Sequence, residues 1–268
     1  MSLSIVDSHC HLDRLDLAKL GEDMDAVLAT ARQLGVTHML CVCIDMGNFP
    51  DVAALAARYP QVYASVGVHP NEQDTRDPRV GELVELAQVP KVVAIGETGL
   101  DYFHGKGNLE WQRERFRRHI RAARESSKPL IIHSRDARED TIRIMREEGA
   151  AEIGGVMHCF TEDWTMAQQA LDLNFYISFS GIVTFRNAEQ VQDVARRVPL
   201  ERMLVETDSP YLTPVPYRGK SNQPAYVRYV AEYIAELRGE SLESIARVTR
   251  DNFFDLFSGA AVPDEKSP

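Results

Sequence analysis

The feature that most constrains the fold is a regular alternation of short apolar segments with longer segments of helical periodicity. Residues 36–44 form a continuous apolar run rich in β-branched side chains, which is typical of a strand buried on both faces. Residues 22–34 carry apolar side chains at helical spacing and end before Gly35, a common helix stop. Strands are expected at residues 5–11, 36–44, 62–66, 92–95, 130–133, 153–158, 175–179 and 203–206.

Each expected strand is followed by a helical segment, and no linker or change of composition divides the chain. This pattern predicts an α/β protein built as one (β/α)8 TIM barrel, which we expect over residues 1–258. Residues 242–257 predict an extra C-terminal helix, and residues 259–268 a short polar tail. An open doubly wound sheet is the alternative. It would normally carry a glycine-rich turn after its first strand, where this chain has histidines.

Charge and cysteine content limit the classes of function. The 40 acidic and 30 basic residues give a net charge of −10, which argues against a broad basic surface for nucleic acid. The 4 cysteines have no disulfide-rich spacing, which favours a reducing compartment. There is no secretory leader pattern and no apolar run of roughly 18 residues. We therefore expect a cytoplasmic protein with no membrane span, either monomeric or weakly oligomeric.

Polar side chains collect where the expected strands end. His9 and His11 close the first strand and point to one side, because side chains alternate along a strand. Such a pair is weak evidence alone. Further polar residues close later strands, namely His69, Glu97, His133, His158 and Asp208. The carboxyl ends of barrel strands converge on one face, so these residues predict a metal site there.

Each of these residues also has a plain structural alternative. Glu97 and Asp208 would serve as helix caps, and His133 and His158 as hydrogen-bonded core histidines. The coincidence of so many ligand-type side chains at one end of the barrel argues against that reading for the whole set.

Other residues of the same chemical types are predicted to lie away from the site. His38 falls at the start of a strand, His104 in a loop and His119 on a charged helix, so none is assigned a catalytic role. Cys10 and Cys159 follow ligand positions and should point away from the barrel interior. The arginines of the helix at 109–126 are expected to form a solvated face rather than a track for DNA.

The order and spacing of six motifs resemble the TatD family of metal-dependent deoxyribonucleases, within the amidohydrolase-like superfamily. The motifs are SHCH at 8–11, GVHP at 67–70, GETGLD at 96–101, IH at 132–133, HCF at 158–160 and ETDSPYL at 206–212. The resemblance runs from about residue 5 to residue 256. It implies two divalent metal ions, with one ion on His9, His11 and Asp208, the other on His133 and His158, and Glu97 bridging both.

Mixed imidazole and carboxylate ligands suit Mg²⁺, Mn²⁺ or Zn²⁺, and a pair of such ions activates water for phosphoryl displacement. Asp208 is the expected catalytic base, because a bound carboxylate can still take the proton of the water. Glu206 lies on the same strand face and is the second expected catalytic carboxylate, either behind the metal ligands or as an additional carboxylate that faces the metals. A buried ion pair with an interior lysine or arginine is the alternative role for Glu206.

The resemblance implies DNA as substrate, with 3′-5′ exonuclease activity on single-stranded ends. Expected phosphate contacts come from His69, Arg135, Arg218 and Lys220, the last two on a proline-rich loop at 214–222 that could equally be a solvated surface loop. The alternative function is an amidohydrolase that acts on an amide, ester or aminoacyl bond with the same metal pair. Metal binding without turnover is a third hypothesis.

Overall fold

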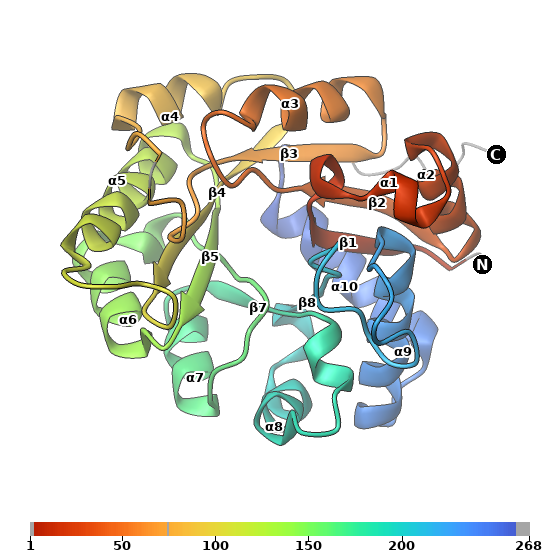
Figure 1. Cartoon of the computed structure of the whole chain (residues 1–268). Helices are drawn as coiled ribbons and strands as arrows, with labels where there is room; N and C mark the ends of the chain where they lie inside the picture. Colours follow the sequence, from red (N-terminus) through yellow and green to blue (C-terminus); the bar gives the residue numbers. More distant parts are fainter. Residues whose placement is uncertain (1–2, 74, 261–268) are drawn as a thin grey trace.

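The computed structural model describes residues 3–73 and 75–260, and these form one ring of parallel strands surrounded by helices (Figure 1). The eight strands follow one another in the order β1 to β8, each hydrogen-bonded in parallel to the next. They are β1 (Ile5–Cys10), β2 (Val36–Cys41), β3 (Val62–Val66), β4 (Val92–Asp101), β5 (Leu130–Arg135), β6 (Gly155–Met157), β7 (Phe175–Phe179) and β8 (Met203–Val205).

The ring is closed where the first strand meets the last. The backbone N–H of His11 donates to the carbonyl of Ser209 at 2.8 Å, and that of Asp208 to the carbonyl of His9 at 2.9 Å. The hydroxyl of Ser8 donates to the carbonyl of Val205 at 3.0 Å. The predicted closed (β/α)8 barrel is therefore confirmed, and the open sheet is excluded.

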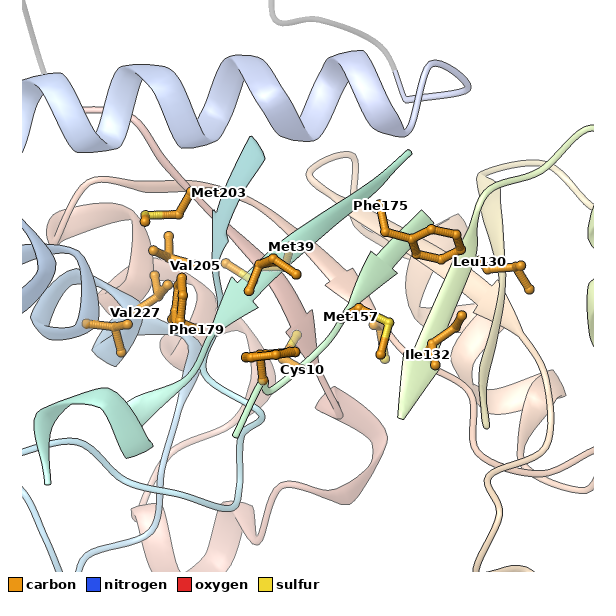
Figure 2. Close-up of a cluster of buried hydrophobic side chains, with 14 of the residues drawn as sticks. Cys10, Met39, Leu130, Ile132, Met157, Phe175, Phe179, Met203, Val205 and Val227 are labelled. Atoms are coloured by element: carbon orange, nitrogen blue, oxygen red, sulfur yellow. The ribbon is translucent and has the colours of Figure 1, made fainter. Parts of the chain in front are cut away.

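Most helices cover the outside of the ring (Figure 1), where they bury an apolar stripe against the strands and expose a polar face. They are α1 (Leu17–Leu20), α2 (Met24–Gln33), α3 (Phe49–Arg58), α4 (Val80–Leu86), α5 (Glu110–Ser126), α6 (Arg138–Glu147), α7 (Trp164–Asp172), α8 (Glu189–Arg197), α9 (Val227–Arg238) and α10 (Leu242–Leu256). Figure 2 shows strand side chains of the buried apolar cluster, among them Met39, Met157, Phe175 and Met203.

The extra C-terminal helix α10 covers the amino-terminal end of the barrel. Phe253 and Phe257 are fully buried and pack in one cluster with Val6 from inside the ring. The phenol of Tyr176, at the start of β7, donates to Asp255 of α10 at 2.7 Å. One end of the barrel is thus sealed by apolar packing, and the polar side chains are left to the other end.

The strands differ from expectation mainly at β4 and β6, while β2 ends early at Cys41 and β5 continues to Arg135. β4 continues to Asp101 instead of ending at residue 95, because Gly99 pairs with His133 in register with β5. Gly99 has φ of 136°, and a Cβ there would lie 2.0 Å from the carbonyl oxygen of His133, so only glycine permits this approach. β6 spans only three residues, because residues 150–152 turn as a 3-10 helix. The short α1 was not expected.

Two further predictions concern the ends and the surface of the chain. The predicted polar tail at 259–268 lies outside the described residues from residue 261 onward, so the domain limits stay a prediction. Across residues 3–73 and 75–260, no helix is both long and apolar enough to cross a bilayer.

Candidate metal centre

The six predicted metal ligands come together at the carboxyl ends of the strands. A cavity of about 590 Å³ opens there, and its lining includes His11, Glu97, His133, His158 and Asp208. His9 lies just beneath, fully buried. Residues from five different strands or strand ends thus converge on one point, as the strand-end pattern predicted.

Glu97 stands at the middle of the cluster and offers one oxygen to each half. Its Oε2 lies 3.3 Å from Nε2 of His9. Its Oε1 lies 2.8 Å from Nε2 of His158, 3.2 Å from Nδ1 of His133 and 3.3 Å from Nε2 of His69. Burial opposes ionisation of Glu97, but the surrounding histidines, foremost His158, hold its pKa well below the usual range. The carboxylate is therefore charged and faces both groups of imidazoles.

Asp208 completes the first half of the cluster. Its Oδ1 lies 3.3 Å from Nε2 of His11 and 3.8 Å from Nε2 of His9, and these two nitrogens are 3.3 Å apart. Asp208 has φ of 56°, in the left-handed region where a non-glycine residue is strained. Burial opposes its ionisation, but the hydrogen bond from His11 and the charges of His11 and His158 lower the pKa of Asp208. The site thus holds an ionised carboxylate beside two converging imidazoles.

In three of the histidines the ring nitrogen that faces away from the cluster has a hydrogen-bond acceptor. Nδ1 of His11 lies 3.0 Å from the carbonyl of Val42. Nε2 of His133 lies 3.3 Å from Oδ2 of Asp101, and Nδ1 of His158 lies 3.1 Å from Oε1 of Glu206. A proton held on the outer nitrogen leaves the inner lone pair free, which is the usual arrangement of metal-binding histidines.

These observations show that the residues fit divalent metal ions. Donor atoms of His9, His11 and Asp208 lie within 4.8 Å of one another. Oε1 of Glu97 lies 3.2 Å from Nδ1 of His133 and 2.8 Å from Nε2 of His158. The donors are nitrogen and oxygen only, which suits Mg²⁺, Mn²⁺ or Zn²⁺. The Nε2 atoms of His9 and His11 lie 3.3 Å apart, so one cation could bind both nitrogens.

Glu206 is buried behind His158 and does not line the cavity. Its Oε1 accepts a hydrogen bond from the backbone N–H of Cys159 at 2.7 Å as well as from His158. Its Oε2 has no hydrogen-bond partner among the described residues. The expected alternative, an ion pair with an interior lysine or arginine, is wrong, because the partner of Glu206 is a histidine.

His69 differs from the other cluster histidines in its protonation. Its Nδ1 accepts a hydrogen bond from the backbone N–H of Asn71 at 3.0 Å, so in the neutral ring Nε2 carries the proton. Burial lowers the pKa of His69, which keeps the ring neutral. A nitrogen that carries a proton donates a hydrogen bond and cannot bind a metal. This supports the predicted role of His69 as a donor to substrate.

The predicted phosphate-binding cations fall in different places. Arg135 lines the cavity, and no carboxylate pairs with its guanidinium within the described part of the chain. Arg218 lies over the ring of Phe185 at 3.8 Å and lines a separate small cavity of about 230 Å³. Lys220 lies over Tyr217 at 5.4 Å and lines neither cavity. Contact of these residues with substrate stays a prediction.

Asp101 is a candidate site residue that the strand-end pattern did not indicate. It is fully buried, and its Oδ2 accepts from His133, from Nδ1 of His104 at 2.9 Å and from Nδ2 of Asn71 at 2.9 Å. Burial raises its pKa, but these hydrogen bonds outweigh burial and keep the carboxyl ionised. The available signal was its place in the motif at 96–101, four residues after Glu97.

The expectation that α5 presents only a solvated arginine face is wrong for Arg115, and His119 is not on a charged outer face. Arg115 is 2% exposed and His119 fully buried. The other arginines of α5 do lie outside, where several pair with acidic residues of α6 and its C-terminal end, as Arg113 does with Asp140 at 2.8 Å. These pairs neutralise the surface, in agreement with the prediction that it is not a track for DNA.

Gln112, Arg115 and His119, which we call the α5 anchor, hold the backbone of the loop after β3. The amide of Gln112 donates to the carbonyl of Pro70 at 3.1 Å. Arg115 donates to the carbonyl of His69 at 3.1 Å and to that of Glu72 at 2.8 Å. Nε2 of His119 accepts from the backbone N–H of Val68 at 3.0 Å. The loop that carries His69 is therefore fixed at successive residues.

The cysteines agree with expectation except at one position. Cys10 is buried and does not line the cavity, as predicted, and Cys41 and Cys43 are also buried, whereas Cys159 is only partly buried and lines the cavity. Cys159 has φ of 42°, so the chain turns sharply there and the alternation of a regular strand no longer applies. Its thiol lies 3.1 Å from the hydroxyl of Ser180.

We expect His119→Gln to change how stability depends on pH. Burial lowers the pKa of His119 to about 4, below the unfolded value of 6.5. This residue therefore stabilises the fold fully above pH 6.5, and that contribution falls as the pH drops toward 4, by roughly 3 kcal/mol in total. Urea unfolding of both proteins should show a constant gap above pH 7 that shrinks in acid. Parallel profiles across the whole range would contradict the prediction.

Comparison with known proteins agrees with this geometry. A model of the family described as TatD related DNase matches residues 6–258. The metal-dependent hydrolase YcfH of Escherichia coli (strain K12) is 54% identical over 254 residues, which cover 94% of this chain and 95% of the relative. The 3′-5′ ssDNA/RNA exonuclease TatD of Klebsiella pneumoniae (strain 342) is 31% identical over 249 residues, or 91% of this chain and 95% of that one.

A solved structure gives the same result at the level of the fold. The crystal structure of YJJV, a TatD homolog from Escherichia coli K12, matches with a TM-score of 0.89 at 29% identity, over 98% of this chain and 100% of that chain. Family, fold and the cluster of nitrogen and oxygen ligands all agree. The chain therefore belongs to the TatD family and is a metal-dependent hydrolase.

Proposed function

We propose that this protein hydrolyses phosphodiester bonds at single-stranded DNA ends, as a 3′-5′ exonuclease that uses two divalent metal ions. The observation that carries the proposal is that the two carboxylate oxygens of Glu97 face different histidines. Oε2 faces His9, whereas Oε1 faces His133 and His158. A carboxylate with one oxygen toward each group of ligands is the bridge that a two-metal centre needs. The name of the Klebsiella relative, an exonuclease of single-stranded DNA and RNA, supports the choice of substrate.

In this proposal the metals, Mg²⁺, Mn²⁺ or Zn²⁺, supply positive charge that polarises the phosphate and acidifies the attacking water. The reaction adds one water across a P–O bond of the strand. Asp208, already ionised, takes the proton of that water. Glu206 fixes the ring of His158 through Nδ1, so its catalytic part is to orient that imidazole. His69 donates from Nε2 to a phosphate oxygen, and Arg135 adds a positive charge.

An amidohydrolase activity on an amide, ester or aminoacyl bond is the alternative, because the same ligands would polarise a carbonyl. The unpaired Arg135 favours phosphate, since a guanidinium binds phosphate oxygens in pairs. The cytoplasmic location and the monomeric or weakly oligomeric state expected from the sequence stay predictions.

Removal and return of metal tests the proposed function. The purified protein, treated with chelator and then supplied with Mg²⁺ or Mn²⁺, should regain release of nucleotides from single-stranded DNA labelled at either end. Asp208→Asn should reduce the rate by about 100- to 10,000-fold, because it removes the base. Asp251→Asn, on the exposed face of α10, is the matched control. Activity on amides but not on DNA would support the alternative, and metal-independent activity would overturn both.

A further inference from the structure

Two exposed aromatic side chains lie beside the cavity, since Tyr211 lines it and Phe103 contacts Arg135, which lines it. Phe103 is 58% exposed and Tyr211 is 51% exposed, and with Val215 they are the large apolar side chains left exposed in the described residues. Phe103 follows β4 and Tyr211 follows β8, so both leave the carboxyl ends of strands, where the metal centre lies. Exposed aromatic rings at a binding site commonly serve to contact a ligand.

The two rings lie on opposite sides of the centre. In a closed ring of eight strands in the order β1 to β8, β4 and β8 are half a turn apart. The ligands between them, Glu97 and Asp208, come from these same two strands or their ends. A strand that crosses the mouth with one phosphate at the ligands would therefore pass one ring on each side.

Tyr211 is held firmly although its ring is exposed. Its backbone N–H donates to the carbonyl of Asp208 at 2.9 Å, and its carbonyl accepts from Nδ2 of the buried Asn222. Nδ2 of Asn222 also donates to the carbonyl of Thr207 at 2.9 Å. The ring lines the cavity, with its centroid 6.1 Å from that of His11. Because the backbone beneath the ring is fixed, stacking of a flat ligand would restrict only the side-chain torsions of Tyr211.

On the other side Phe103 supports a cation. The guanidinium carbon of Arg135 lies 4.1 Å from the centroid of the Phe103 ring. This guanidinium lines the cavity and has no acidic partner among the described residues. A planar cation stacked on an aromatic ring offers one flat face and several N–H donors. That combination suits a nucleobase and its neighbouring phosphate.

We propose that Tyr211 and the Phe103–Arg135 pair are two stacking subsites for the nucleobases that flank the scissile phosphate of a single strand. The inference rests on the proposed function and deepens it. Bases in a duplex have their faces covered by neighbouring base pairs, whereas unpaired bases at a free end can stack on protein rings. The two subsites would therefore explain selection of single-stranded ends without base-specific hydrogen bonds.

The test uses the metal-loaded protein and short single-stranded oligonucleotides, intact or with an abasic residue on one side of the terminal phosphodiester. Tyr211→Ala and Phe103→Ala should each raise KM for the intact strand by roughly 10- to 100-fold with a much smaller change in kcat. An abasic residue on one side of the phosphodiester should raise the KM of the wild type by a similar factor. It should not raise KM further in the variant that lacks the ring on that side.

Conservative and control variants make the result specific to stacking. Tyr211→Phe keeps the ring and should behave as wild type, whereas Phe103→Leu keeps only apolar volume and should remain impaired. Val215→Ala removes the remaining exposed apolar side chain and should leave KM unchanged. Hydrolysis of oligonucleotides by every variant with unchanged KM would overturn the subsites and leave the nuclease function standing. Failure of the wild type to cleave any oligonucleotide would overturn the proposed function itself.

Discussion

Glu97→Gln should abolish tight metal binding and lower the metal-dependent rate by on the order of 1,000-fold. The substitution keeps the size of the side chain but removes a buried negative charge that faces His9, His133 and His158. One oxygen also becomes an NH₂ group, which donates hydrogen bonds and cannot bind a cation. Metal content by elemental analysis and titration calorimetry with Mn²⁺ would measure the first effect, and steady-state kinetics the second.

A glutamate of an outer ion pair provides the control for Glu97. Glu148 pairs with Arg117 at 2.9 Å and with Arg121 at 2.8 Å, far in the fold from the cavity. Glu148→Gln should keep both metal content and rate, because Glu148 does not line the cavity. If the Glu97→Gln variant binds metal with wild-type stoichiometry and affinity, the carboxylate of Glu97 is not a metal ligand.

Arg115→Ala should lower the free energy of unfolding by about 3 kcal/mol, the largest loss expected from any surface-type residue of this chain. The guanidinium is 2% exposed and bonds Asp77 and the carbonyls of His69 and Glu72. Its removal leaves these carbonyls without their charged donor and opens a cavity beneath Trp111, whose ring lies 4.8 Å from it. Urea unfolding followed by circular dichroism would measure the loss.

The neighbouring Arg118 is a matched control, because it also approaches Asp77, at 3.6 Å, but is 33% exposed. Arg118→Ala should cost less than about 1 kcal/mol. Arg115→Lys should recover only part of the stability, since an ammonium cannot reach three acceptors with the geometry of a guanidinium fork. Equal losses of stability for Arg115→Ala and Arg118→Ala would mean that burial of Arg115 does not increase its contribution to the free energy of unfolding.

The barrel and its ligands were predictable because both depend on order along the chain. Strand ends that alternate with helices must gather at one face of a closed ring, so Glu97 and Asp208 could be placed together from sequence alone. The placement of Glu97 and Asp208 does not depend on where each helix begins or ends. The early end predicted for β4 was wrong, yet Glu97 still faced the centre.

The residues that support the ligands were not predictable in this way. Arg115 and His119 lie four residues apart on the buried face of α5, beside apolar side chains. Sequence patterns place charged residues on the exposed face of a helix, so these two residues were expected at the surface. Their partners are backbone groups of a loop more than 40 residues earlier, whose position only the folded chain defines. The same holds for Arg218, which a proline-rich loop directs onto Phe185.

The residues that close the ring between β1 and β8 include candidate metal ligands. The hydrogen bonds between β1 and the end of β8 are made by the backbones of His9, His11, Asp208 and Ser209, three of which also supply the first group of ligands. The two ends of a sheet some 200 residues apart are thus brought together by the residues that would share a cation. A metal bound there would link the first and last strands of the barrel, and its binding free energy would add to that of folding. An open junction between β1 and β8 would separate His9 and His11 from Asp208, so the candidate site forms only when the ring is closed.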